Sequence, residues 1–177
     1  GVQEVWKIME DDYNSGNDNA KTNVRTYNIL IDAWAKSEDQ NAPLEAESLL
    51  KEMVDAYSKG NLDEGPNTIT YSSVINCWNK SNRPEAAQRA LDILKTMVSI
   101  FKEYGNTNIR PNLITYNSVL CSHAKRGNIE GAKEVWQIMK DDVCSGNANA
   151  RPNIRMYNIL IDAYSKSENQ DAPLQAE

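Results

Sequence analysis

Apolar side chains recur along the chain at the three- and four-residue intervals that predict amphipathic helices. Four similar stretches carry this pattern: VRTYNILIDAWAKS (24–37), TITYSSVINCWNKS (68–81), LITYNSVLCSHAKR (113–126) and IRMYNILIDAYSKS (154–167). Their apolar or aromatic positions are Tyr27, Leu30, Ile31 and Trp34; Tyr71, Val74, Ile75 and Trp78; Tyr116, Val119, Leu120 and His123; and Tyr157, Leu160, Ile161 and Tyr164. Each set falls on one face, so each stretch predicts a helix with a single packed side.

A second apolar pattern follows each of the first three stretches and predicts a partner helix. Its members are Ala46, Leu49, Leu50 and Met53; Ala87, Ala90, Leu91 and Leu94; and Ala132, Val135, Trp136 and Met139. Linkers rich in Gly, Asn and Asp, such as residues 11–23 and 141–153, are expected to be loops. Two short helices cannot bury their apolar faces alone, whereas stacked pairs bury a continuous core. We therefore expect an all-α fold, a solenoid of stacked antiparallel helix pairs.

The chain repeats itself. Residues 1–47 match residues 131–177 at an offset of 130, with 31 identities in 47 positions, and the four stretches begin 44, 45 and 41 residues apart. We predict a single repeat array over residues 1–177, divided as follows: the second helix and linker of a truncated repeat (1–23), three repeats (24–67, 68–112 and 113–153) and a partial repeat (154–177). Both ends cut through a repeat, so we expect a fragment of a longer array.

The first helix of each pair has a further stripe that packing does not explain, called here the polar ladder. Its members are Arg25, Asn28, Asp32 and Lys36; Ile69, Ser72, Asn76 and Lys80; Ile114, Asn117, Cys121 and Lys125; and Arg155, Asn158, Asp162 and Lys166. Their 3-4-4 spacing keeps each set on one helix face, and stacking would align the sets. Each set has Asn or Ser near its start and a lysine about two turns later. Ordinary solvated helix ends, where cations complement the helix dipole, are the alternative explanation of the lysines.

The net charge of −6 has the wrong sign for a protein that attracts nucleic acid by its overall field. The polar ladder, however, holds six cations against two carboxylates, a net of +4, which leaves −10 for the rest of the chain. Screening limits the reach of surface charges to about 8–10 Å at physiological salt. A basic stripe inside an acidic shell can therefore still bind a polyanion.

Several other classes of protein lack support in the sequence. There is no apolar run near the ~18 residues of a membrane helix. The three cysteines, Cys77, Cys121 and Cys144, form no C-x-x-C motif, and an odd number is a poor disulfide framework. His123, the one histidine, is interpreted as a packed residue. The acidic pairs at 11–12 and 141–142 lack the EF-hand pattern, and we expect them to be solvated helix-end charges. We predict no enzyme, no metal, no cofactor and no small-molecule substrate.

These residues resemble the pentatricopeptide-repeat (PPR) family. The matching features are the tetrapeptides TYNI, TYSS and TYNS, a lysine nine residues after each tyrosine, the A-x-x-L-L-x-x-M of the second helix and the closing Pro-Asn. The resemblance covers essentially the whole chain. It implies a right-handed superhelical solenoid that binds single-stranded RNA at about one base per repeat, and RNA processing in a mitochondrion or plastid. Repeats of 41–45 residues are longer than is typical of the family.

The resemblance also assigns roles along the polar ladder. In the family, the residue after the motif's tyrosine and the residue that closes the repeat select one base together. The pairs here are Asn28 with Asn67, Ser72 with Asn112, and Asn117 with Asn153, and Asn158 would begin a fourth pair. Asn with Asn favours a pyrimidine and Ser with Asn favours adenine, so the expected core site is 5′-pyrimidine-A-pyrimidine-3′. Base stacking falls to Arg25, Ile69, Ile114 and Arg155, and phosphate contact to Lys36, Lys80, Lys125 and Lys166.

Two alternatives to a plain RNA-binding array remain open at this point. Helical solenoids commonly bind peptides in their groove, and the acidity of this chain is compatible with a protein–protein interaction scaffold. The array could also be the RNA-targeting arm of a processing enzyme whose catalytic domain lies outside the fragment.

Overall fold

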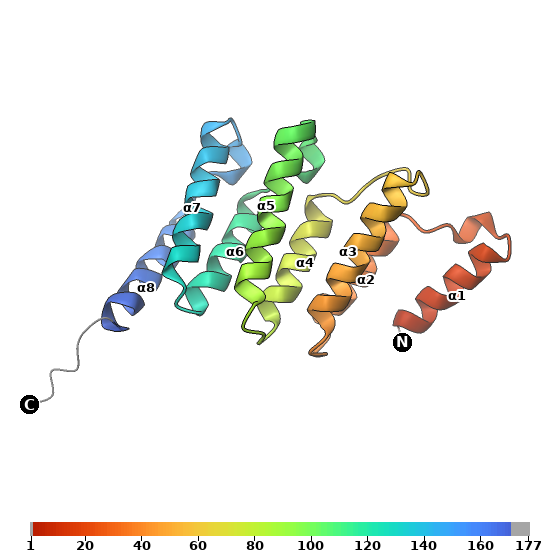
Figure 1. The fold of residues 1–177 in the computed structure, drawn as a ribbon, viewed down its shortest axis with the longest axis horizontal. Coiled ribbons are helices and arrows are strands. Elements are labelled where there is room, and N and C mark those ends of the chain that lie inside the picture. The colour runs from red at the N-terminus through yellow and green to blue at the C-terminus, as the bar shows by residue number, and fades with distance from the viewer. Residues whose placement is uncertain (1, 171–177) are drawn as a thin grey trace, which may run out of the picture. The chain divides into compact units, whose positions relative to one another are not determined.

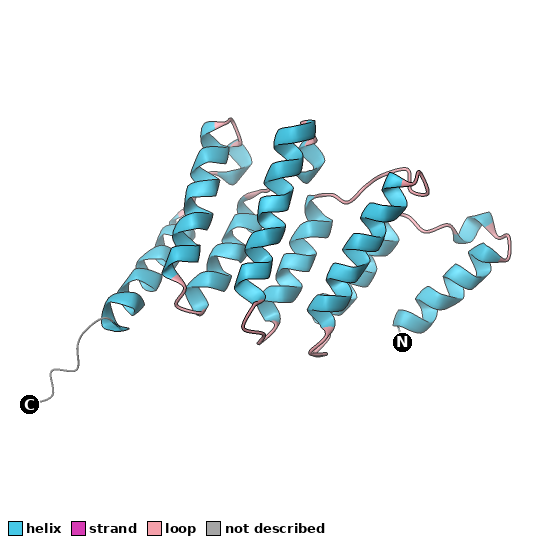
Figure 2. Ribbon diagram, viewed as in Figure 1, coloured by secondary structure: helices cyan, strands magenta, loops and turns pink. Residues whose placement is uncertain are grey.

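A computed structural model describes residues 2–170. In this part of the chain the fold is all-α, with eight α-helices, three short 3₁₀ turns and no strand. Figure 2 shows the ribbon coloured by secondary structure, with helices joined by loops. The chain divides into two compact units, Gly1–Ser81 and Asn82–Glu177, which are described separately below. No described helix is long and apolar enough to cross a membrane.

The first unit holds four helices. They are α1 (Val2–Asn14), α2 (Val24–Lys36), α3 (Ala42–Ser58) and α4 (Thr68–Lys80), with a 3₁₀ turn, η1 (Asp18–Ala20), between the first two. Helix α2 packs against both α3 and α4 (Figure 1). The predicted apolar positions of α4 are all buried, and Trp78 is completely enclosed. Burying a large apolar side chain contributes about 1.5–3 kcal/mol, so this shared core explains why the helices pack as pairs.

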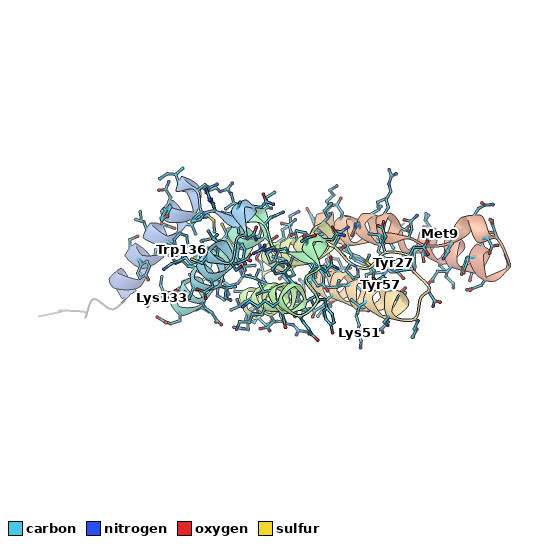
Figure 3. The ribbon with its side chains drawn as sticks, turned by 90° about the horizontal axis from the view of Figure 1, so that it is seen from above. Met9, Tyr27, Lys51, Tyr57, Lys133 and Trp136 are labelled. Carbon is cyan, nitrogen blue, oxygen red and sulfur yellow. The ribbon has the colours of Figure 1, made fainter. Side chains whose placement is uncertain are left out.

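Tyr27 and Met53 form a buried cluster in the same unit with Leu62 from the linker. The Tyr27 ring, labelled in Figure 3, lies 5.3 Å from the Trp6 ring, which brings α1 against α2. The Tyr27 hydroxyl donates to Glu52 Oε1 at 2.8 Å, so the polar end of the ring is satisfied as well.

The second unit repeats this plan. It contains α5 (Ala86–Tyr104), α6 (Leu113–Lys125), α7 (Ile129–Cys144) and α8 (Ile154–Gln170), with the turns η2 (Thr107–Ile109) and η3 (Ala148–Ala150). Helix α6 packs against α5, α7 and α8. The predicted packed positions of α6 are fully buried, His123 among them. Trp136 of α7, labelled in Figure 3, sets its ring 5.1 Å from that of Tyr157.

Two predictions about the ends of α1 and α7 were wrong. Residues 11–14 and 141–144 are helical instead of loop, because each helix continues through its acidic pair. Asp142 is also not a solvated charge, since only 6% of it is exposed. Its carboxylate accepts hydrogen bonds from Arg110, Tyr116 and Asn147, and these donors are the physical reason for its burial.

The apolar face predicted for the fourth copy is largely exposed. On α8, Ile161 is 66% exposed, and the rings of Tyr157 and Tyr164 are partly covered by Trp136 and Lys133 of α7. The last part of the predicted partial repeat, residues 171–177, lies outside the described residues. The handedness of the superhelix and the division into repeats remain predictions, although α2, α4, α6 and α8 begin within the predicted repeats at residues 24, 68, 113 and 154.

Candidate nucleic-acid interface

The closing asparagines of the predicted base-reading pairs are helix N-caps. Asn67 Oδ1 accepts the backbone N–H groups of Ile69 and Thr70 at 3.0 and 3.2 Å, and Thr70 Oγ1 accepts the Asn67 N–H at 3.1 Å. This reciprocal arrangement is a capping box, which satisfies donors that a helix leaves unpaired in its first turn. The asparagine before each first helix therefore has a structural role in addition to the one the sequence suggested.

The first predicted pair comes together in space through Thr70. The Thr70 hydroxyl donates to Asn28 Oδ1 at 2.7 Å and lies 3.3 Å from Asn67 Oδ1. Asn28 and Asn67 stand 39 positions apart in sequence, yet one hydroxyl group contacts both amides where α2 packs on α4. Both carbonyl oxygens already accept hydrogen bonds within the protein, so the amide nitrogens are the ends that face a ligand most readily.

In the second unit the same plan recurs with one change. Asn112 Oδ1 accepts from the N–H groups of Ile114 and Thr115, again in a capping box. Asn153 Oδ1 accepts from the Met156 N–H at 3.2 Å, but Met156 supplies no hydroxyl group. Asn117 Oδ1 is buried and has no hydrogen-bond partner among the described residues.

The other two predicted base-selecting positions carry less information. Ser72 is half-buried on α4 and Asn158 is exposed on α8. Ser72 and its proposed partner Asn112 belong to different units, so that pairing stays a prediction.

The four predicted stacking residues are exposed. Ile69 is 65% exposed and Ile114 is 69% exposed, and Arg25 and Arg155 are exposed as well. Aliphatic side chains that stand out of a helix without packing are available to contact a planar base. Their exposure agrees with a stacking role, which the structure itself leaves as a prediction.

The four predicted phosphate-binding lysines have unequal surroundings. Lys36 and Lys166 lie 2.6 Å from Asp32 and Asp162, one turn earlier on the same helices. Lys80 Nζ donates to the Ala35 carbonyl oxygen at 2.7 Å, near the end of α2. Lys125 has no ion pair or hydrogen bond within residues 2–170. Lys125 is therefore the lysine most available to a phosphate.

One functional residue escaped the sequence analysis. Thr70 was treated as part of a family tetrapeptide, although the motif Asn-x-x-Thr at 67–70 is a visible capping signal and recurs at 112–115. The contact between Thr70 and Asn28 could not be predicted from the residues around either one, because it depends on how α4 packs against α2.

Outside the polar ladder, the titratable groups of the described residues include one strongly shifted thiol. Burial raises the pKa of Cys77 to about 11, so this thiol stays protonated and unreactive at neutral pH. No group of His, Cys, Asp and Glu side chains within residues 2–170 is arranged to hold a metal ion.

Comparisons with known proteins found similar repeat sequences and a similar fold. A sequence model described as a pentatricopeptide repeat domain matches residues 99–167, and one described as a PPR repeat matches residues 69–100. Together these matches span more than half of the 177 residues. A comparison with curated protein sequences gave no match.

A solved structure with a similar fold is the PPR domain of Arabidopsis thaliana protein-only RNase P 1, in complex with tRNA. The TM-score is 0.66 at 17% identity, and the match covers 96% of this chain and 75% of that one. At this level of identity the likeness concerns the fold.

Proposed function

The chain belongs to the pentatricopeptide-repeat family, and from that premise we propose that it binds single-stranded RNA sequence-selectively, at about one base per repeat. The observation that carries the proposal is the Asn28–Thr70–Asn67 contact, which joins the first predicted base-reading pair within one unit. Short amide groups on a helix edge can donate to the Watson–Crick edge of an unpaired base. The expected core site is 5′-pyrimidine-A-pyrimidine-3′, and the expected setting is RNA metabolism in a mitochondrion or plastid.

Three further observations support RNA as the ligand. Repeats of this family are typically non-catalytic RNA-binding modules, and the similar PPR domain was solved with tRNA. Ile69 and Ile114 project from the same helix faces as the selecting residues. Lys125 adds a cation that the described part of the chain leaves unpaired. A targeting arm for a processing enzyme would use the same surface and differ only in what flanks it.

Selection of bound sequences from a random RNA pool tests the proposal. The whole chain should enrich the motif pyrimidine-A-pyrimidine, because each asparagine or serine contacts a different base. Enrichment without any base preference would contradict sequence selectivity. Failure to retain RNA at low salt would favour the protein-binding alternative.

A substitution at one position makes the test sharper. Ser72→Asn converts the second pair to Asn with Asn, so the middle base should change from adenine towards a pyrimidine while the flanking bases keep their preference. Ser73→Asn, on the neighbouring position of α4, is the matched control and should leave all three preferences unchanged. An unaltered preference at the middle base in Ser72→Asn would refute the base-reading assignment.

A further inference from the structure

An asparagine amide has two chemically different ends, and which end faces a ligand decides what it can recognise. The oxygen accepts a hydrogen bond and the nitrogen donates two. Cytosine and uracil differ at the ring nitrogen N3, which accepts a hydrogen bond in cytosine and carries a proton in uracil. An amide held with its nitrogen outward can bond to cytosine N3, whereas an amide free to turn can match either base.

In the first predicted pair the amide of Asn28 is held in one orientation. Thr70 Oγ1 already accepts the Asn67 backbone N–H, so the single proton of the hydroxyl group is left to donate. It points at Asn28 Oδ1, at the 2.7 Å typical of a good O–H···O hydrogen bond. Turning the amide would move that proton to the longer 3.3 Å contact with Asn67 Oδ1, an oxygen that already accepts two backbone N–H groups.

In the third predicted pair nothing equivalent holds Asn117. Met156 stands where Thr70 stands in the earlier repeat, three residues after the closing asparagine, and its thioether has no proton to donate. Met156 is fully buried, and Asn117 Oδ1 is buried without a hydrogen-bond partner among the described residues. No hydrogen bond from the described residues to the Asn117 oxygen fixes the orientation of this amide, so a bound base sets it.

We propose that Thr70 and Met156 are positioning residues that make the two Asn–Asn pairs read pyrimidines differently. Thr70 directs the Asn28 nitrogen outward and selects cytosine at the first base. Met156 leaves the Asn117 amide free and admits cytosine and uracil alike at the third base. The inference rests on the proposed RNA-binding function and adds to it a base preference that the residue pair alone does not determine.

Binding of the whole chain to short labelled RNAs tests this directly. The RNAs carry the pyrimidine-A-pyrimidine core with cytosine or uracil at the first or the third base. The unaltered chain should favour cytosine about fivefold at the first base, as expected for one neutral hydrogen bond, and discriminate less than about twofold at the third. Thr70→Val should abolish the preference at the first base, and Thr70→Ser, which keeps the hydroxyl group, should retain it.

The reciprocal variant Met156→Thr should create a cytosine preference at the third base without changing the first. Thr70 also belongs to a capping box, so a purely structural effect of Thr70→Val would weaken binding to all four RNAs equally. Its thermal unfolding is measured in parallel. An unchanged cytosine-to-uracil ratio at the first base in Thr70→Val, or at the third base in Met156→Thr, would overturn the inference while leaving RNA binding intact. An unaltered chain that binds none of the RNAs would overturn the proposed function and this inference together.

Discussion

At the scale of single residues, the buried carboxylate of Asp142 joins more groups than any side chain discussed above. Its Oδ1 accepts from Arg110 Nη2 at 2.8 Å, and its Oδ2 accepts from the Tyr116 hydroxyl at 2.9 Å and from Asn147 Nδ2 at 2.6 Å. Burial is the largest cause that raises the pKa of Tyr116 above its ordinary value, and the negative charge of Asp142 is the next. The phenol therefore stays protonated and can donate its hydrogen bond. The network connects the segment before α6 to the end of α7.

Asp142→Ala should therefore lower the free energy of unfolding by about 3–5 kcal/mol, the usual cost of breaking a buried ion pair from one side. The cost arises because Tyr116 loses its acceptor and Arg110 loses the carboxylate that balances its charge, while both stay largely buried. Asp141→Ala is the matched control, because Asp141 is exposed and its carboxylate accepts a hydrogen bond from Gln137 on the same helix. This change should alter stability by less than about 1 kcal/mol. Urea unfolding of both variants measures the difference, and equal effects would contradict the structural role of the network.

His123 gives the fold a pH dependence of predictable sign. Burial is the largest cause that lowers its pKa from 6.5, and the side chain is completely buried. His123 is therefore protonated more readily in the unfolded chain than in the folded one. The free energy of unfolding should fall as the pH drops below about 6.5. Thermal unfolding between pH 7 and pH 5 measures this loss. Because the chain has one histidine, His123→Gln should flatten the profile, and an identical slope in that variant would assign the loss elsewhere.

At the scale of helices, the His123 ring of α6 lies directly against Gly131 of α7. A Cβ atom added at Gly131 would overlap the ring atoms Nδ1 and Cε1 of His123. Alanine in a helix is favoured over glycine by about 1 kcal/mol, whereas overpacking a core costs about 1–3 kcal/mol. Gly131→Ala should therefore destabilise the protein despite its better helix propensity.

The double variant Gly131→Ala with His123→Ala separates these two effects. With the ring gone, the added methyl group has room, so the glycine substitution should become neutral or stabilising in the His123→Ala background. Unfolding measured by circular dichroism over this double-mutant cycle gives the coupling between the two sites. Additive effects would show that the ring does not set the spacing of the helices.

The helices themselves were largely predictable from the sequence, and the contacts between them were not. The three- and four-residue spacing of apolar residues predicted the packed faces of α2, α4 and α6. The sequence of a single helix is enough to show which of its faces is apolar. The ends of α1 and α7 were missed, since Gly and Asn near 14–17 and 144–147 suggested loops too early. The contacts of Asp142 with Tyr116 and Arg110, and that of Thr70 with Asn28, join residues 26 to 42 positions apart. No pattern along the chain encodes such contacts.

At the scale of the whole molecule, binding of a polyanion by an acidic protein should depend on a few cations. Four lysine–phosphate contacts would give a slope near −3 for the logarithm of the binding constant against that of the salt concentration, from about −0.7 per contact. Lys125 is exposed and makes no ion pair or hydrogen bond with the described residues, so Lys125→Ala should reduce the magnitude of that slope by about 0.7.

The acidic partners provide a complementary variant. Asp32→Asn keeps the size of the side chain and releases Lys36 from its 2.6 Å ion pair, so RNA affinity should rise, most clearly at low salt. Asp39→Asn, an exposed carboxylate beyond the end of α2, is the control. Titrations at several salt concentrations measure both quantities, and a slope unaffected by Lys125→Ala would remove this lysine from the phosphate contacts.

The ion pair between Arg110 and Asp142 suggests how a repeat array can accommodate longer repeats. Asn147 Nδ2 donates to the Pro111 carbonyl oxygen at 2.7 Å. This hydrogen bond joins the segment that precedes α6 to the segment that follows α7. A helical hairpin whose ends are joined in this way keeps its packing whatever residues follow the joined segment. Extra residues inserted after Asn147 would then lengthen the linker without loosening the packing of α6 against α7.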